Sequence, residues 1–201
     1  LDLHRKSTSL LFNFDEEIAA DIVEKAKELD VCGHEIERSC IRFIAMEQPL
    51  ATDLMYIESS IRVISHVKRI AYLCRNIAES AATIEGIKVS NKIMGDLEYM
   101  ADYVQIMLTR GFGSFCNQDI SVARELASDD DKVDDLFDII LSHTTELLTE
   151  KTQNALEIVN IIFIARYLER IADRVVNIGE RVIFINTHKR PHIEELKKEE
   201  Q

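Results

Sequence analysis

The amino-acid sequence predicts an all-α fold made of two tandem three-helix bundles, and three observations support this prediction. The chain has 201 residues, of which 46% are apolar, so it is long enough to bury a sizeable core. Only 6 glycines and 2 prolines occur, which is too few turn formers for the many short strands of a sandwich or barrel. The apolar residues recur at helical spacing, and the second half of the chain repeats the first.

The first half is expected to contain one short helix followed by two long ones. Only residues 1–12 precede the first long helix, so the first helix of this half is either short or truncated. The long helices are predicted over residues 15–45 and 51–83. The pair Gln48 and Pro49 separates them, because proline is disfavoured inside a helix but suits a first helical turn.

Three long helices are predicted in the second half, over residues 90–115, 119–148 and 152–185. In the last of these, apolar residues recur at spacings of four, three, four and three, which is typical of a buried helix face. These residues are Ile171, Val175, Ile178, Val182 and Ile185. The glycines at positions 111 and 113 are expected to weaken or end the helix over residues 90–115.

An internal repeat relates the two halves. The twelve residues from Lys68 (KRIAYLCRNIAE) match the twelve from Glu169 (ERIADRVVNIGE) at six positions. With a four-residue difference in the connection between helices, Glu37 aligns with Asp134. We therefore predict a first helical repeat over residues 1–86, a second over residues 87–190, and a charged C-terminal tail over residues 191–201.

The charge and hydropathy of the chain argue against several classes of partner. Asp and Glu outnumber Lys and Arg by 36 to 24, so the formal net charge is −12 and the pI is near 5.0. Such a surface repels nucleic acids and anionic lipids. No apolar run approaches the ~20 residues of a spanning helix, and no leader opens the sequence. The four cysteines lack disulfide or zinc spacing. We expect a cytoplasmic protein without membrane insertion or nucleic-acid binding.

No catalytic motif is apparent. Di-iron bundle enzymes need a glutamate three residues before a histidine, and none of the six histidines has one. The sequence also contains neither a G-x-S-x-G motif nor a glycine-rich loop that could bind phosphate. We therefore expect a protein that is not an enzyme.

A set of carboxylates in the second half could hold a metal ion. On a helix that turns 100° per residue, Glu169, Asp173 and Asn177 form one stripe, which is predicted to be an exposed acidic row facing away from the apolar face. Asp130 and Asp134 have the same spacing on the preceding helix. If the two helices are antiparallel neighbours, their acidic pairs can converge.

Like charges four residues apart repel, so this cluster needs a nearby cation. One source is a bound metal, because carboxylates with an amide oxygen suit hard or borderline ions. We expect a divalent or trivalent metal, with iron, zinc, manganese and magnesium as candidates and its identity open. The other source is the protein, with Glu169 paired to Arg166 and Asp173 paired to Arg170 on a solvated face. The spacing leaves both alternatives open.

Three segments of the chain resemble the PhoU family of phosphate-uptake regulators. Residues 165–180 (ARYLERIADRVVNIGE) look like the family signature. Residues 48–54 (QPLATDL) and 130–136 (DDKVDDL) are similar to its helix motifs. The likeness implies two three-helix bundles related by a pseudo-two-fold axis, each with an E(D)-x-x-x-D metal site on its surface. In the second half the implied ligands are Asp130, Asp134, Glu169 and Asp173, with Asn177 as an amide ligand.

The first half departs from this family pattern. At the four positions where the family has acids, the repeat places Gly33 and Glu37 on one helix and Lys68 and Tyr72 on the other. One carboxylate of four is kept, so metal binding by the first half is an open question. We predict that Lys68 pairs with Glu37, which would put a fixed ammonium group where the family has its cation.

The resemblance implies a regulator of phosphate uptake and phosphate homeostasis that acts as a metal-binding helical adaptor on the phosphate transport system. Its expected partners are the ATPase subunit of the phosphate ABC transporter and a membrane sensor kinase. Whether the chain also forms a homodimer is an open question. The alternative is an accessory domain of a larger protein, either a sodium-phosphate cotransporter or a DNA-binding regulator.

Overall fold

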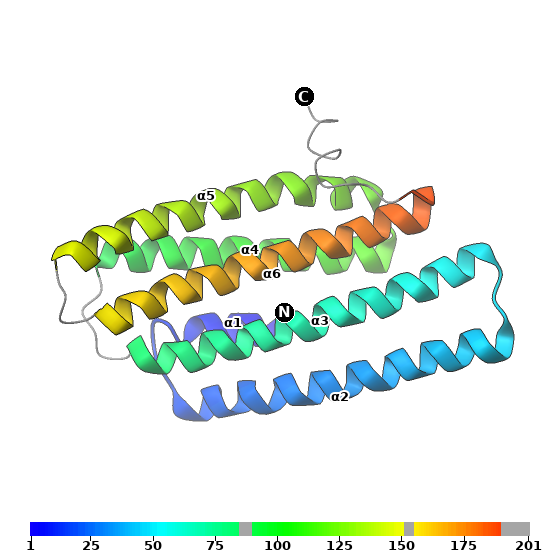
Figure 1. Ribbon diagram of the computed structural model, residues 1–201, viewed down its shortest axis with the longest axis horizontal. Coiled ribbons are helices and arrows are strands. Elements are labelled where there is room, and N and C mark those ends of the chain that lie inside the picture. Colours follow the sequence, from blue (N-terminus) through cyan, green and yellow to red (C-terminus); the bar gives the residue numbers. More distant parts are fainter. Residues whose placement is uncertain (85–89, 151–154, 190–201) are drawn as a thin grey trace.

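The computed structural model describes residues 1–84, 90–150 and 155–189, and it confirms the all-α fold. These residues form six helices, three from each half of the chain: α1 (Asp2–Ser9), α2 (Glu16–Glu47), α3 (Ala51–Ile84), α4 (Asn91–Asn117), α5 (Ile120–Glu150) and α6 (Ala155–Thr187). They lie roughly along one long axis (Figure 1). The predicted tail, and the predicted boundary between residues 86 and 87, lie outside the described residues.

Polar side chains and left-handed residues define the helix ends. The Asp15 carboxylate accepts hydrogen bonds from the backbone amides of Glu17 and Ile18 at 2.9 and 3.0 Å, so α2 begins where the sequence predicts. Gln48 and Gln118 have φ angles of 46° and 54°, in the left-handed region that ends α2 and α4. The predicted break at residues 48–49 is therefore confirmed.

Helices α3 and α6 join the two halves. They lie side by side in the middle of the molecule, with α2 on one side and α4 and α5 on the other (Figure 1). Helix α6 packs against α3, α4 and α5, which explains why its apolar face is almost completely buried. All five apolar residues predicted for that face are buried, from Ile171 to Ile185. The sequence prediction for α6 is thus confirmed.

The prediction that the glycines weaken or end α4 is wrong. Helix α4 continues through Gly111 and Gly113 as far as Asn117. A Cβ atom on Gly111 would lie 2.4 Å from Cγ1 of Val175 on α6, so the missing side chain lets the two helices approach closely. Tertiary packing at this point outweighs the ~1 kcal/mol by which glycine disfavours a helix.

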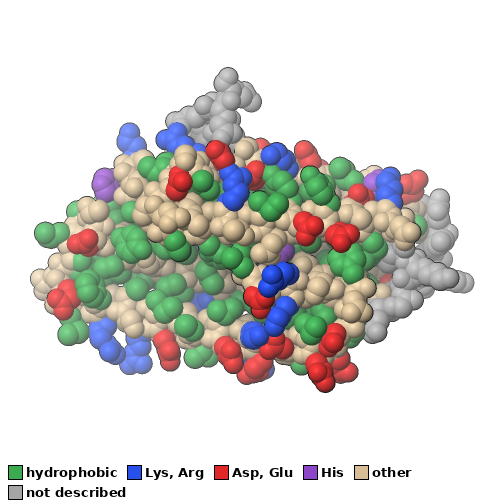
Figure 2. Space-filling view, turned by 180° about the vertical axis from the view of Figure 1, so that it is seen from behind, with side chains coloured by type: hydrophobic (Ala, Val, Ile, Leu, Met, Phe, Trp, Pro, Cys, Tyr) green, Lys and Arg blue, Asp and Glu red, His purple; other side chains and the backbone are tan. Residues whose placement is uncertain are grey.

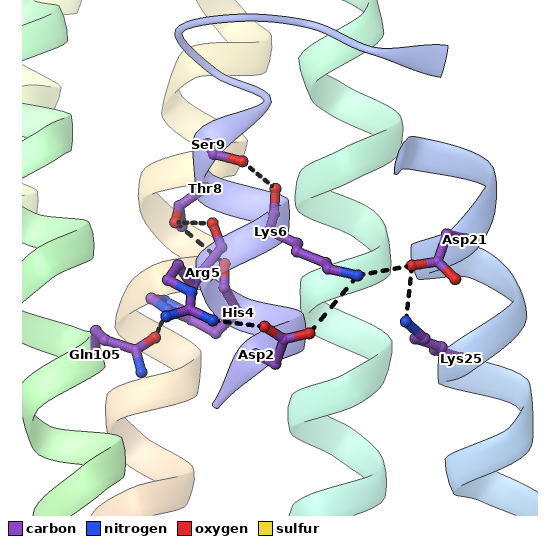
Figure 3. Close-up of polar contacts among 9 residues, drawn as sticks. All are labelled: Asp2, His4, Arg5, Lys6, Thr8, Ser9, Asp21, Lys25 and Gln105. Carbon is purple, nitrogen blue, oxygen red and sulfur yellow. Dashed lines mark hydrogen bonds and ion pairs between the residues drawn. The ribbon is translucent and has the colours of Figure 1, made fainter. Parts of the chain in front are cut away.

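Helix α1 is short, as predicted, and it contacts both halves of the molecule (Figure 3). The ammonium group of Lys6 lies 3.0 Å from a carboxylate oxygen of Asp21 on α2. On the other side, the imidazole of His4 makes a 2.8 Å hydrogen bond to the side chain of Gln105 on α4. This helix of about two turns therefore bridges α2 and α4 across the face of α3.

Apolar side chains are also found on the surface. Seen from behind, they spread over the middle of the molecule, while many charged side chains lie toward its upper and lower edges (Figure 2). Helix α2, which packs against α3 and α1, exposes several large ones, including Val31, Ile41, Phe43 and Met46. Within the described part of the chain, no helix is both long enough and apolar enough to cross a membrane.

Candidate functional site

The five residues predicted as metal ligands lie on two neighbouring helices. Asp130 and Asp134 belong to α5, whereas Glu169, Asp173 and Asn177 belong to α6, and α5 packs along α6. Asp130 is buried, Asp134 is exposed, and the three residues of α6 are half-buried. The prediction of an exposed acidic row on α6 is therefore wrong, since these three residues are half-buried. Because α6 is surrounded by three helices, even its polar stripe is partly removed from solvent.

The charges of this acidic cluster act on one another. Burial raises the pKa of Glu169, and the negative charges of Asp134 and Asp173 raise it further. The guanidinium of Arg166 acts in the opposite direction and lowers this pKa. Carboxylates from α5 and α6 thus lie close enough to repel one another, as the predicted convergence of the two helices requires.

A protein cation already compensates one of these acids. Arg166, one turn before Glu169 on α6, forms an ion pair with both carboxylate oxygens of Glu169. The ion pair of Glu169 with Arg166, one of the two considered from the sequence as an alternative to a metal, is therefore present. The other, between Asp173 and Arg170, does not form, since Arg170 lines a groove against α3.

The cluster has the donor chemistry of a metal site. Four carboxylates and one amide supply only oxygen ligands, which suit hard or borderline cations. The amide nitrogen of Asn177 donates a hydrogen bond to the backbone oxygen of Asp173, so its amide oxygen does not serve that bond. Among the described residues, no three acid, histidine or cysteine side chains stand in a ready metal-binding arrangement. Metal binding would require Arg166 to release Glu169.

The corresponding place in the first half holds an ion pair. Nζ of Lys68 lies 3.0 Å from Oε1 of Glu37 and 4.0 Å from Oδ1 of Asp30, so the predicted pairing of Lys68 with Glu37 is confirmed. A Cβ atom on Gly33 would lie 2.5 Å from Cδ of Lys68. The stem of Lys68 therefore crosses α2 at the glycine that aligns with Asp130, and a side chain there would obstruct it.

Sequence reasoning missed a polar network next to this site. Asp129 is buried and accepts hydrogen bonds from the hydroxyl of Tyr103, at 2.6 Å, and from the guanidinium of Arg110. Arg110 also pairs with Glu125, so these contacts tie α4 to α5. Asp129 lies in a run of three aspartates, and periodicity alone does not tell which of them is directed toward another helix.

Comparison with known proteins supports the family resemblance found in the sequence. A family model described as the PhoU domain matches residues 1–81 and 97–182. A protein of Methanothermobacter thermautotrophicus, named phosphate-specific transport system accessory protein PhoU homolog 1, is 43% identical over 191 residues, covering 95% of this chain and 87% of the relative.

Two crystal structures share the fold. The structure of PhoU from Pseudomonas aeruginosa has a TM-score of 0.89 at 24% identity, covering 94% of this chain and 90% of that one. The phosphate transport system regulatory protein PhoU from Streptococcus pneumoniae has a TM-score of 0.87 at 22% identity, covering 95% and 89%. With the family model matched along most of its length, the chain belongs to the PhoU domain family.

Proposed function

We propose that this chain is a cytoplasmic regulatory accessory protein of phosphate uptake and that it is not an enzyme. The observation that carries the proposal is the 43% identity to a protein named as an accessory protein of the phosphate-specific transport system. The match extends over 87% of that relative's length, which favours this function over an accessory domain of a cotransporter or of a DNA-binding regulator.

The acidic cluster of the second half is proposed to bind a divalent or trivalent metal. Asp130, Asp134, Glu169 and Asp173 would supply carboxylate oxygens, and Asn177 would supply an amide oxygen. Burial is the main cause that raises the pKa of Glu169, and the negative charges of Asp134 and Asp173 add to it; this supports the proposal, because a metal ion would offset both effects. The metal would replace Arg166 as the cation beside Glu169, and the freed guanidinium could then contact a partner. In the first half, Lys68 already occupies the cation position.

The metal proposal is tested by metal analysis of protein purified without added metal, followed by titration with iron, zinc, manganese and magnesium. Asp173→Ala should lower the metal content and abolish the stabilisation by metal, which is about 2.7 kcal/mol when the free metal is at 100 times its Kd. The matched control is Asp135→Ala, which removes an exposed carboxylate from α5. Absence of bound metal and of any metal-dependent stabilisation in the unmodified protein would disprove this part of the proposal.

The proposed partner is the ATPase subunit of the phosphate ABC transporter, with a membrane sensor kinase as a second candidate and self-association into a dimer as a third. A net charge of −12 suits a partner with a basic surface. Cells that lack the protein should show altered phosphate uptake, and the ATPase subunit should be recovered with it by pull-down. Normal uptake at both low and high external phosphate in such cells would contradict the proposed regulatory role.

A further inference from the structure

Helices α3 and α6 lie side by side where the two halves of the molecule meet (Figure 1). A polar groove is lined by residues of these two helices and by one residue of α2. It has a volume of about 470 Å³, within the range of roughly 300–1,000 Å³ that is usual for small-molecule sites. Lys68 and Arg69 line it from the first half, and Arg170 and Arg174 line it from the second. Asp30 of α2 is the only acidic residue in this lining.

The cations of the groove are unequally compensated. Lys68 is paired with Glu37 and Asp30. The guanidinium of Arg69 lies over the ring of Tyr72, 4.9 Å from its centroid, which leaves its charge uncancelled. Neither Arg170 nor Arg174 forms an ion pair with a carboxylate of residues 1–84, 90–150 or 155–189.

Two further observations indicate that the groove favours an anion. Nε of Arg174 is buried and has no hydrogen-bond partner, although buried guanidinium N–H groups are costly to leave unsatisfied. In addition, His66 in the same lining has its pKa lowered to about 4, first by burial and then by the charges of Arg174, Arg181 and Arg62. Its imidazole is therefore neutral near pH 7, and the local potential is positive although the whole chain is acidic.

The arrangement suits a multiply charged oxyanion better than a single carboxylate. Arg170 and Arg174 are four residues apart on one helix, so their side chains are neighbours, about 5–6 Å apart at Cβ. Each planar guanidinium can donate two parallel hydrogen bonds to a phosphate group. One carboxylate would balance only one of the three arginines, whereas a phosphate group carries up to two charges and accepts bonds at several oxygens.

We propose that the groove between α3 and α6 binds a phosphate group, held by Arg69, Arg170 and Arg174. The bound molecule is either inorganic phosphate or a small phosphorylated compound such as a nucleotide, and both would use the same arginines. Because Arg69 belongs to the first half and the other two belong to the second, the ligand would fix the position of α3 against α6. This site goes beyond the proposed regulatory function and does not depend on the metal site.

The acidic cluster and the groove lie on adjoining sides of one helix. Glu169 and Asp173 each precede one of the arginines by one residue, so the two rows are rotated by about 100° around α6. A phosphate group could also bind to a metal in the acidic cluster. Binding experiments therefore need a chelator, which removes that second route and separates the two proposals.

The test is calorimetric titration of the full chain, with chelator present and ionic strength held constant with chloride. Inorganic phosphate and ATP are the two probes. The unmodified protein should bind at least one of them, and Arg170→Gln or Arg174→Gln should weaken binding about tenfold or more. Arg69→Gln tests the same prediction from the other half. Arg42→Gln, which removes an exposed charge from α2, should leave the affinity unchanged.

Each result of these titrations either supports or overturns the phosphate site. Binding of inorganic phosphate alone identifies free phosphate as a ligand, and binding of ATP without inorganic phosphate identifies an organic phosphate; both support the site. A shift of the imidazole NMR signal of His66 on binding would locate the ligand in the groove even if one arginine variant failed to fold. No binding of either probe at millimolar concentration, or equal weakening by Arg42→Gln, would overturn the proposal.

Discussion

The buried histidine of α1 makes the stability of this protein depend on pH. His4 is 1% exposed, and its Nδ1 atom lies 2.8 Å from Oε1 of Gln105 (Figure 3). A carbonyl oxygen only accepts hydrogen bonds, so Nδ1 must carry the hydrogen, and the unprotonated Nε2 is buried without a partner. Protonation of Nε2 would place a charge in an apolar site. Burial accordingly lowers the pKa of His4 to about 4, from a usual value of 6.5.

The sign and size of the effect follow from linkage. Between pH 6.5 and pH 4 the unfolded chain binds a proton at His4 that the folded chain does not, so the free energy of unfolding falls as the pH falls. A shift of one pKa unit corresponds to about 1.4 kcal/mol. The stability that His4 contributes in its neutral form is therefore reduced by about 2 kcal/mol at about pH 5, and by roughly 3 kcal/mol below pH 4.

Urea unfolding of the unmodified protein and of His4→Asn, each at about pH 7.5 and about pH 5, measures this contribution. Asparagine keeps an N–H donor for Gln105 but does not titrate. Between about pH 7.5 and about pH 5, the free energy of unfolding should fall by about 2 kcal/mol more in the unmodified protein than in the variant. His66, whose pKa is lowered in the same direction, is present in both proteins and cancels. Equal losses in the two proteins would refute the reasoning.

Two further substitutions probe the packing and the ion pair described above. Gly111→Ala should destabilise the protein by about 1–3 kcal/mol, because the new Cβ would meet Cγ1 of Val175. Urea unfolding measures this, and a stabilised variant would contradict it. In a double-mutant cycle with Glu37→Gln and Lys68→Met, the coupling free energy should be about 0–1 kcal/mol, since both side chains keep some contact with solvent. A coupling free energy of several kcal/mol would contradict this prediction.

The sequence by itself determined the helices, the repeat and one contact between helices. Apolar spacing is a local property of the chain, so it predicted the buried face of α6 from Ile171 to Ile185. The alignment of the two halves transferred the geometry of one acidic pair to the other half. This transfer is why the ion pair of Lys68 with Glu37 could be predicted without a structure.

Only the tertiary structure decided what covers each face. Periodicity shows that Glu169 is opposite the apolar face, but the packing of α5 along α6 decides that it is half-buried and paired with Arg166. Gly111 favours the end of a helix in isolation, yet the close approach of Val175 makes it part of one. The groove with Arg69 and Arg170 could not be read from the sequence at all. Its charges come from segments about a hundred residues apart, and only the packing of α3 against α6 brings them together.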